Sequence, residues 1–129
     1  MEPKTMIKGT GIDLTELDRI QALWERYGER FVRKILTDRE QAQLPRRNPV
    51  PRLAALFACK EAAVKALGTG FTEGIHCRCI EILHRPNGKP EIAFLGKGLE
   101  RCERMGVTGA HVSMTHSRDA AAATVILEG

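Results

Sequence analysis

The first third of the chain alternates apolar and polar residues in a way that predicts one strand followed by helices. Residues 7–14 form a short apolar run with glycines at positions 9 and 11, which is typical of a strand. Residues 15–28 repeat apolar side chains every three or four positions, as an amphipathic helix does, and 29–36 continue this spacing. The residues predicted to face inward are Leu17, Ile20, Trp24, Tyr27, Phe31 and Ile35.

Capping and breaking residues predict where the next elements begin and end. Thr15, with Asp18 three residues later, approximates a capping box, and Thr37 with Glu40 matches one fully. The stretch "LPRRNPVPR" contains three prolines and predicts an extended, mobile loop. A long central helix is expected over 52–67, ended by Gly68.

The second half of the chain predicts mostly strands. Residues 79–83 and 91–95 are joined through Asn87-Gly88, which favours a hairpin. A short helix is expected over 96–105, and two further strands, 111–115 and 120–127, form a second hairpin. We therefore predict one α+β domain over residues 1–129, a compact unit in which a small, mainly antiparallel sheet packs with the long central helix and shorter helices.

Composition and charge narrow the class of protein. The 129 residues suit one domain, and 43% hydrophobic with 28% charged residues argues against a disordered chain. No apolar run approaches the roughly 20 residues of a membrane helix, and the first residues lack a secretion signal, so we expect a soluble, cytoplasmic protein. The net charge of +4 favours an anionic partner.

The four cysteines do not predict a disulfide framework or a zinc site. Cys77 and Cys79 form a C-x-C pair without a second pair or a nearby histidine to complete a zinc set. Placed on a strand, the two thiols would share one face. We expect free, buried thiols at these positions and at Cys59 and Cys102.

One residue interrupts the apolar stripe of the central helix. At about 100° per residue, Lys60 falls in the middle of a face formed by apolar side chains. Its ammonium can reach water at the edge of the stripe, or it can be held in a pocket for an anion such as a phosphate. We favour the second interpretation, with Lys60 facing a subunit boundary and an anion. The apolar face comprises Leu53, Leu56, Phe57, Val64 and Leu67.

Three further charged residues suggest a site for a metal ion and a polyphosphate. Glu61 and Lys65 are spaced i, i+4, which fits either a surface ion pair or a set that binds both ligands. Asp13 ends a strand whose two glycines would leave room for a metal, although it can equally be a helix N-terminal charge. Magnesium needs only one or two carboxylates beside phosphates and waters.

Several motifs together resemble the holo-acyl-carrier-protein synthases, the short 4′-phosphopantetheinyl transferases. They are "GIDL", "FACKEAAVKALGTG" and "HVSMTHSRDAAAATVIL", with "ILTDRE" and "PNGKP" between them, so the likeness covers nearly the whole chain. The resemblance implies the fold of that family and transfer of 4′-phosphopantetheine from coenzyme A to a serine of apo-acyl carrier protein. It also implies a magnesium cofactor, adenosine 3′,5′-bisphosphate as the second product, and a homotrimer whose sites are shared between subunits.

The resemblance also assigns roles to residues. It makes Asp13 and Glu61 the magnesium ligands, and we expect Glu61 to accept the serine proton through water, with His116 as the competing base. Relatives often carry arginine directly before the phenylalanine of the helix motif, where this chain has Leu56, and we expect Arg52 to supply that charge. The residues expected to bind coenzyme A are Arg52, Lys60, Lys65, Gly68, His116 and Ser117, of which Lys65 and His116 are also expected to be catalytic.

A ridge of arginines on the first helices suggests how an acidic acyl carrier protein would dock. Arg19, Arg26, Arg30 and Arg33 recur at helical spacing, and Arg19, Leu23 and Arg26 form the predicted docking surface. Interleaved glutamates also fit a simple solvated face. We expect His111 to be structural or to face an interface, and His76 and His84 to be exposed.

Three other functions compete with this one. The acceptor can instead be a carrier domain of a polyketide or peptide synthetase, although the length favours the fatty-acid type. The chain can also be a non-catalytic module that binds nucleotides, or an assembly scaffold. Nucleic acid is not an expected partner, because no aromatic platform or recognised motif is present.

Overall fold

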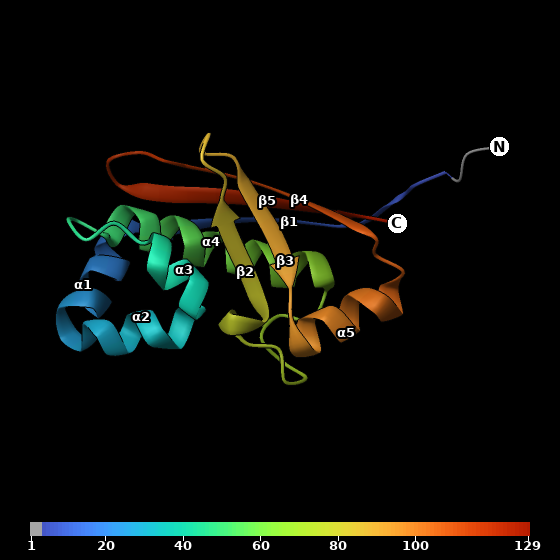
Figure 1. Cartoon of the computed structure of the whole chain (residues 1–129), viewed down its shortest axis with the longest axis horizontal. Coiled ribbons are helices and arrows are strands. Elements are labelled where there is room, and N and C mark those ends of the chain that lie inside the picture. Colours follow the sequence, from blue (N-terminus) through green and yellow to red (C-terminus); the bar gives the residue numbers. More distant parts are fainter. Residues whose placement is uncertain (1–3) are drawn as a thin grey trace.

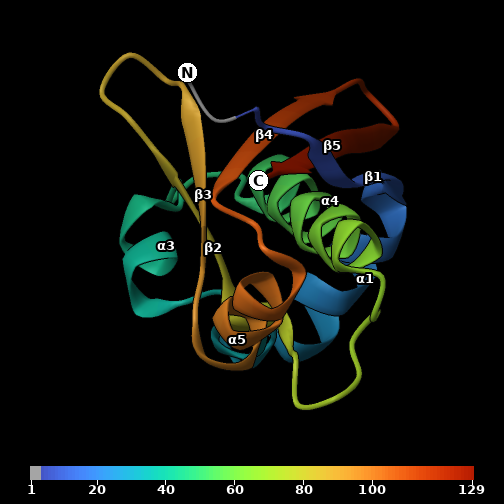
Figure 2. The ribbon, with the colours of Figure 1, turned by 90° about the vertical axis from the view of Figure 1, so that its right-hand side faces the viewer.

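The longest helix, α4 (Val50–Leu67), lies along one face of a three-stranded antiparallel sheet. The sheet has the order β1 (Ile7–Glu16), β5 (Ala120–Glu128) and β4 (Gly109–His116), so the N-terminal strand pairs with the C-terminal one. Figure 1 and Figure 2 show this arrangement from two sides. The structure is a computed structural model and describes residues 4–129.

Two glycines allow β1 to lie directly against α4. A Cβ added at Gly11 would come within 1.8 Å of the carbonyl oxygen of Ala62, and one at Gly9 within 2.1 Å of that of Ala66. Any side chain at either position would therefore force the strand away from the helix. The prediction that these glycines leave room for a metal is wrong, since the helix backbone fills that space.

Three shorter helices cover one end of α4. They are α1 (Leu17–Tyr27), α2 (Glu29–Ile35) and α3 (Asp38–Gln43), and Phe31 and Ile35 are buried as predicted. The capping box of Thr37 and Glu40 is confirmed. Thr15 is not a cap, because β1 pairs with β5 as far as Glu16 and the helix begins only after it.

The proline-rich loop is shorter than predicted. Helix α4 already begins at Val50, and Pro51 lies in its first turn. Backbone N–H groups in the first turn have no partner within the helix, so the N–H that proline lacks costs no hydrogen bond there. At the other end, Gly68 adopts a left-handed conformation with φ of 76° and ends the helix, as predicted.

The middle of the chain forms a second, separate sheet. Strands β2 (Ile80–His84) and β3 (Pro90–Phe94) pair antiparallel as a hairpin, and α5 (Gly96–Met105) follows with the predicted bounds. Where a single sheet was expected, the structure therefore has two. The α+β class and the helix-on-sheet packing are confirmed.

The cysteines are free, as predicted, but their surroundings differ from the expected ones. Cys77 and Cys79 lie in a turn of 3₁₀-helix, η1 (Cys77–Cys79), rather than on a strand, and Cys77 is only half-buried. Burial raises the pKa of the Cys59 thiol to about 12 and that of Cys77 to about 11. Within residues 4–129, no group of three or more metal-binding side chains comes together, and no helix has the length and apolarity needed to span a membrane.

Candidate active site

The close contact of β1 and α4 brings the predicted metal ligand Asp13 next to Lys65. The Lys65 ammonium lies 3.1 Å from Asp13 Oδ1 and donates a hydrogen bond to the carbonyl oxygen of Ile12 at 3.0 Å. The other carboxylate oxygen, Oδ2, accepts a hydrogen bond from the buried hydroxyl of Thr15 at 2.9 Å. Residues 52 positions apart in the sequence therefore form one polar cluster on the helix–strand boundary.

Glu61 belongs to the same cluster electrostatically. Partial burial raises the pKa of Glu61 above its ordinary value, the negative charge of Asp13 raises it further, and the cations of Arg19 and Lys65 oppose the shift. The negative charges of Asp13 and Glu61 together favour a bound cation at this place. Asp13 and Glu61 also supply the hard oxygen ligands that magnesium prefers, so the cluster fits this ion.

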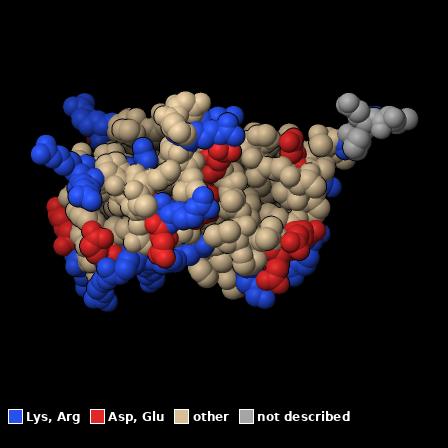
Figure 3. Space-filling model, in the orientation of Figure 1, with Lys and Arg blue, Asp and Glu red and all other residues tan. Residues whose placement is uncertain are grey.

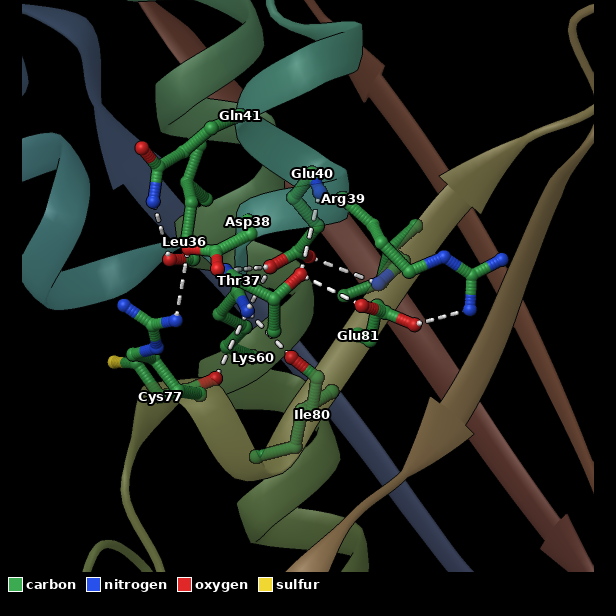
Figure 4. Close-up of polar contacts among 12 residues, drawn as sticks. Leu36, Thr37, Asp38, Arg39, Glu40, Gln41, Lys60, Cys77, Ile80 and Glu81 are labelled. Atoms are coloured by element: carbon green, nitrogen blue, oxygen red, sulfur yellow. Dashed lines mark hydrogen bonds and ion pairs between the residues drawn. The ribbon is translucent and has the colours of Figure 1, made fainter.

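Lys60 does not belong to this cluster. Its side chain is completely buried, and its ammonium donates to Glu40 Oε1 at 2.8 Å and to the carbonyl oxygens of Cys77 and Ile80 at 2.8 and 2.5 Å, as Figure 4 shows. These three bonds use all three donors of an ammonium group. The predictions that Lys60 binds coenzyme A and faces a subunit boundary are therefore wrong, as is the alternative that it reaches water.

The partner of Lys60 is Glu40, which was predicted only as part of a capping box. Glu40 Oε1 also accepts from the backbone N–H of Thr37, and Oε2 accepts from that of Ile82 at 2.9 Å. The buried pair thus ties α3 and α4 to η1 and β2. The "TDRE" motif marks Glu40 as the last residue of a capping box. Such a glutamate is explained by its hydrogen bond to the start of its own helix, so the motif does not predict a distant partner.

A groove of about 810 Å³ opens between α1, α2 and the segment after α4. It brings together the predicted docking residues Arg19 and Leu23, and the Arg19 guanidinium lies 5.4 Å from the centre of the Phe57 ring. Arg26 is not among the lining residues and lies over the ring of Tyr27. The lining is both aromatic and basic: Arg19, Leu23, Tyr27, Arg30, Phe31, Lys34, Ile35, Phe57, Phe71, Ile75, His76 and Cys77.

Figure 3 shows lysines and arginines gathered over the end of the molecule that α1 and α2 form, with acidic side chains between them. The basic ridge is thus a mixed surface with a basic excess, rather than a uniform one. Such a surface can attract an acidic partner while its groove supplies apolar contacts.

A second groove of about 350 Å³ brings together Arg52 and His116, both predicted to bind the nucleotide. His84 also lines it, with Nδ1 3.5 Å from an Arg52 nitrogen, and burial together with the Arg52 charge lowers the pKa of His84. His84 was expected in solvent, and its contact with Arg52 could not be predicted from sequence because it depends on β2 passing beside α4. Asp13, Glu61 and Lys65 do not line this groove.

The two remaining residues expected to bind coenzyme A lie in turns. Ser117 accepts backbone N–H bonds from Asp119 and Ala120 and shapes the β4–β5 connection. Gly68 ends α4, where the Arg101 side chain donates to the carbonyl oxygen of Leu67 at 3.1 Å. In a single chain the predicted residues therefore form separate groups, one around Asp13 and one around His116.

Comparison with known proteins identifies the family. The sequence model of the 4′-phosphopantetheinyl transferase superfamily matches residues 9–125. The chain is 60% identical over 123 residues to a holo-acyl-carrier-protein synthase of Maridesulfovibrio salexigens, an alignment that covers 95% of this chain and 99% of that one.

Solved structures agree with the sequence match. The crystal structure of the holo-acyl-carrier-protein synthase of Neisseria meningitidis has a TM-score of 0.85 and 38% identity, covering 96% of this chain and all of that one. The enzyme of Bacillus anthracis, solved in complex with CoA (3′,5′-ADP), has a TM-score of 0.78 and 32% identity over 96% of this chain and 98% of its own. The chain therefore belongs to the 4′-phosphopantetheinyl transferase superfamily, as an enzyme of the holo-acyl-carrier-protein synthase family.

Proposed function

We propose that this enzyme transfers 4′-phosphopantetheine from coenzyme A to a serine of apo-acyl carrier protein in a magnesium-dependent reaction that releases adenosine 3′,5′-bisphosphate. The proposed acceptor is the carrier of fatty-acid synthesis, and the proposed location is the cytoplasm. The observation that carries the proposal is the cluster of Asp13, Glu61 and Lys65 on the β1–α4 boundary. The coenzyme A complex of a relative supports the cosubstrate.

The residues of the cluster have complementary roles in this proposal. Asp13 and Glu61 would hold magnesium, which when bound would neutralise the charge that develops on the pyrophosphate oxygens. Lys65 would bind the same phosphates through its ammonium. Glu61 would accept the serine proton through water. The alternative base, His116, lies in the second groove instead.

Mass spectrometry of a purified apo-acyl carrier protein tests the proposal directly. After incubation with this enzyme, coenzyme A and magnesium, the carrier should gain the mass of one phosphopantetheine, and a serine-to-alanine carrier should not. An unchanged carrier mass would refute the proposed activity. If only a peptide-synthetase carrier domain were modified, that domain would be the acceptor instead of the fatty-acid carrier.

A homotrimer with shared sites would bring the separate groups together. The sheet face away from α4 exposes apolar side chains that a monomer would leave in water: Ile12 is 71%, Leu14 64% and Ile126 37% exposed. Packing this face against other copies would bury that surface. It would also allow Arg52 and His116 of one subunit to bind the nucleotide beside Asp13 and Glu61 of the next.

The Ile126→Lys substitution tests this assembly. Ile126 lies on the central strand of the exposed face, so a charge there should prevent the subunits from associating. Light scattering should give about three times the 14.3 kDa chain mass for the parent and a single chain for the variant. Leu99→Lys on α5, at a position that is 45% exposed, is the matched control and should stay trimeric. A parent that behaves as a monomer would exclude the shared site.

Charge reversal at Arg19 tests the proposed docking surface. The acidic carrier would contact Arg19 and Leu23, which line the larger groove, and Arg26, which lies over the Tyr27 ring of that lining. Arg19→Glu is expected to raise the KM for the carrier by about tenfold and to leave the KM for coenzyme A close to the parent value. Arg104→Glu on α5 makes the same charge change away from this groove and is the control. Equal effects of Arg19→Glu on both KM values would argue against docking.

A further inference from the structure

Lys65 forms an ion pair with Asp13, one of the two residues that would hold the metal ion. The ammonium lies 3.1 Å from Asp13 Oδ1, and the carboxylate is largely buried, with 15% of the Asp13 side chain exposed. Arg19 and Lys65 are the cations that act on the neighbouring Glu61 carboxylate. Lys65 therefore supplies the positive charge nearest to Asp13 within the cluster.

The two partners of Asp13 differ in how readily they can leave. Thr15 is 2% exposed, and its short side chain fixes the hydroxyl against Oδ2. Lys65 has 53% of its side chain exposed, and its ammonium sits at the end of a flexible four-carbon stem. Partly exposed ion pairs of this kind contribute about 0–1 kcal/mol, so Lys65 can exchange its partner at little cost.

We infer that Lys65 is an exchangeable counter-ion for the acidic pair. In the free protein it neutralises Asp13; when a divalent cation binds Asp13 and Glu61, the ammonium moves to the phosphates of the cosubstrate. This inference rests on the proposed function and deepens it, because it describes how the two ligands influence each other.

The exchange predicts cooperative binding. A divalent cation alone must compete with the Lys65 charge, whereas the phosphates of coenzyme A give that ammonium a new partner and so reduce the competition. Each ligand should then increase the affinity for the other by the same factor, as linkage requires. The same lysine would thus lower the affinity for the metal when coenzyme A is absent and raise the affinity for coenzyme A when the metal is present.

Titration of the free enzyme with Mn²⁺, followed by the paramagnetic resonance signal of the unbound ion, tests this inference. Without coenzyme A, Lys65→Met should bind Mn²⁺ about tenfold more tightly than the parent, since a unit charge next to the carboxylate has been removed. Addition of coenzyme A should tighten Mn²⁺ binding in the parent and much less in the variant. Lys65→Gln should behave like Lys65→Met and provides a second variant if the first folds poorly.

Lys97→Met on α5 removes the same charge from an exposed lysine that pairs with Glu100, and it should bind Mn²⁺ as the parent does. Equal or weaker Mn²⁺ binding by the Lys65 variants would overturn the inference. If the parent modifies the carrier while the Lys65 variants bind Mn²⁺ no more tightly than the parent does, the proposed exchange of Lys65 is wrong. The proposed activity is supported in that case. If the parent does not modify the carrier, the proposed function itself fails.

Discussion

Replacing Glu61 with glutamine is expected to lower turnover by about 10²- to 10⁴-fold, the contribution typical of a positioned general base. Glutamine keeps the size of the side chain but removes a charge next to Asp13 and the site that accepts the serine proton. Initial rates of holo-carrier formation, measured with saturating magnesium and coenzyme A, report the change. Near-parental turnover of Glu61→Gln would show that another residue, with His116 as the first candidate, is the base.

The stability of Glu61→Gln provides an internal control for this experiment. Because the folded protein raises the pKa of Glu61 above 4.5, the unfolded chain loses this proton first as the pH rises. Folding stability therefore falls as the pH increases from the ordinary glutamate pKa through the raised one. At neutral pH the variant should be more stable than the parent by up to about 1 kcal/mol, a small gain because Glu61 is partly solvated. Below pH 4 the two proteins should be equally stable. Because the variant should be no less stable than the parent at the neutral pH of the assay, a loss of turnover would not come from unfolding.

Substitution of Lys60 with methionine should cause the largest loss of stability, about 3–5 kcal/mol, because it leaves the buried Glu40 carboxylate without its cation. Two backbone carbonyl groups, those of Cys77 and Ile80, also lose their donor. Denaturant unfolding followed by circular dichroism measures the free energy of unfolding. Lys97→Met is the matched control and should change it by less than about 0.5 kcal/mol.

A double substitution separates the ion pair from the other contacts of Lys60. Glu40→Gln alone should also be destabilising, since it leaves the buried ammonium uncompensated. In Glu40→Gln/Lys60→Met neither charge of this pair remains to be left unpaired, so the combined loss should be clearly smaller than the sum of the two single losses. Strict additivity would show that the two charges do not stabilise each other.

Local sequence determined much of this protein's secondary structure. The bounds of α5, the Thr37–Glu40 capping box, the end of α4 at Gly68 and the Asn87-Gly88 hairpin all follow from interactions between residues a few positions apart. Such interactions depend little on the rest of the fold, so periodicity, caps and turns were enough to predict them. The motifs in turn identified the family, because they combine these elements with charged residues in a specific order.

The partners of the charged residues were decided only by the tertiary structure. The sequence shows that Lys60 interrupts an apolar stripe, but Glu40 reaches it only because α3 and β2 pack onto the same side of α4. Similarly, Thr15 binds Asp13 instead of capping a helix because β1 continues through it, and His84 meets Arg52 across 32 positions of sequence. A buried charge or hydroxyl group needs a hydrogen-bond partner close by. Which groups lie close by depends on how distant segments pack, and this is decided only in the folded chain.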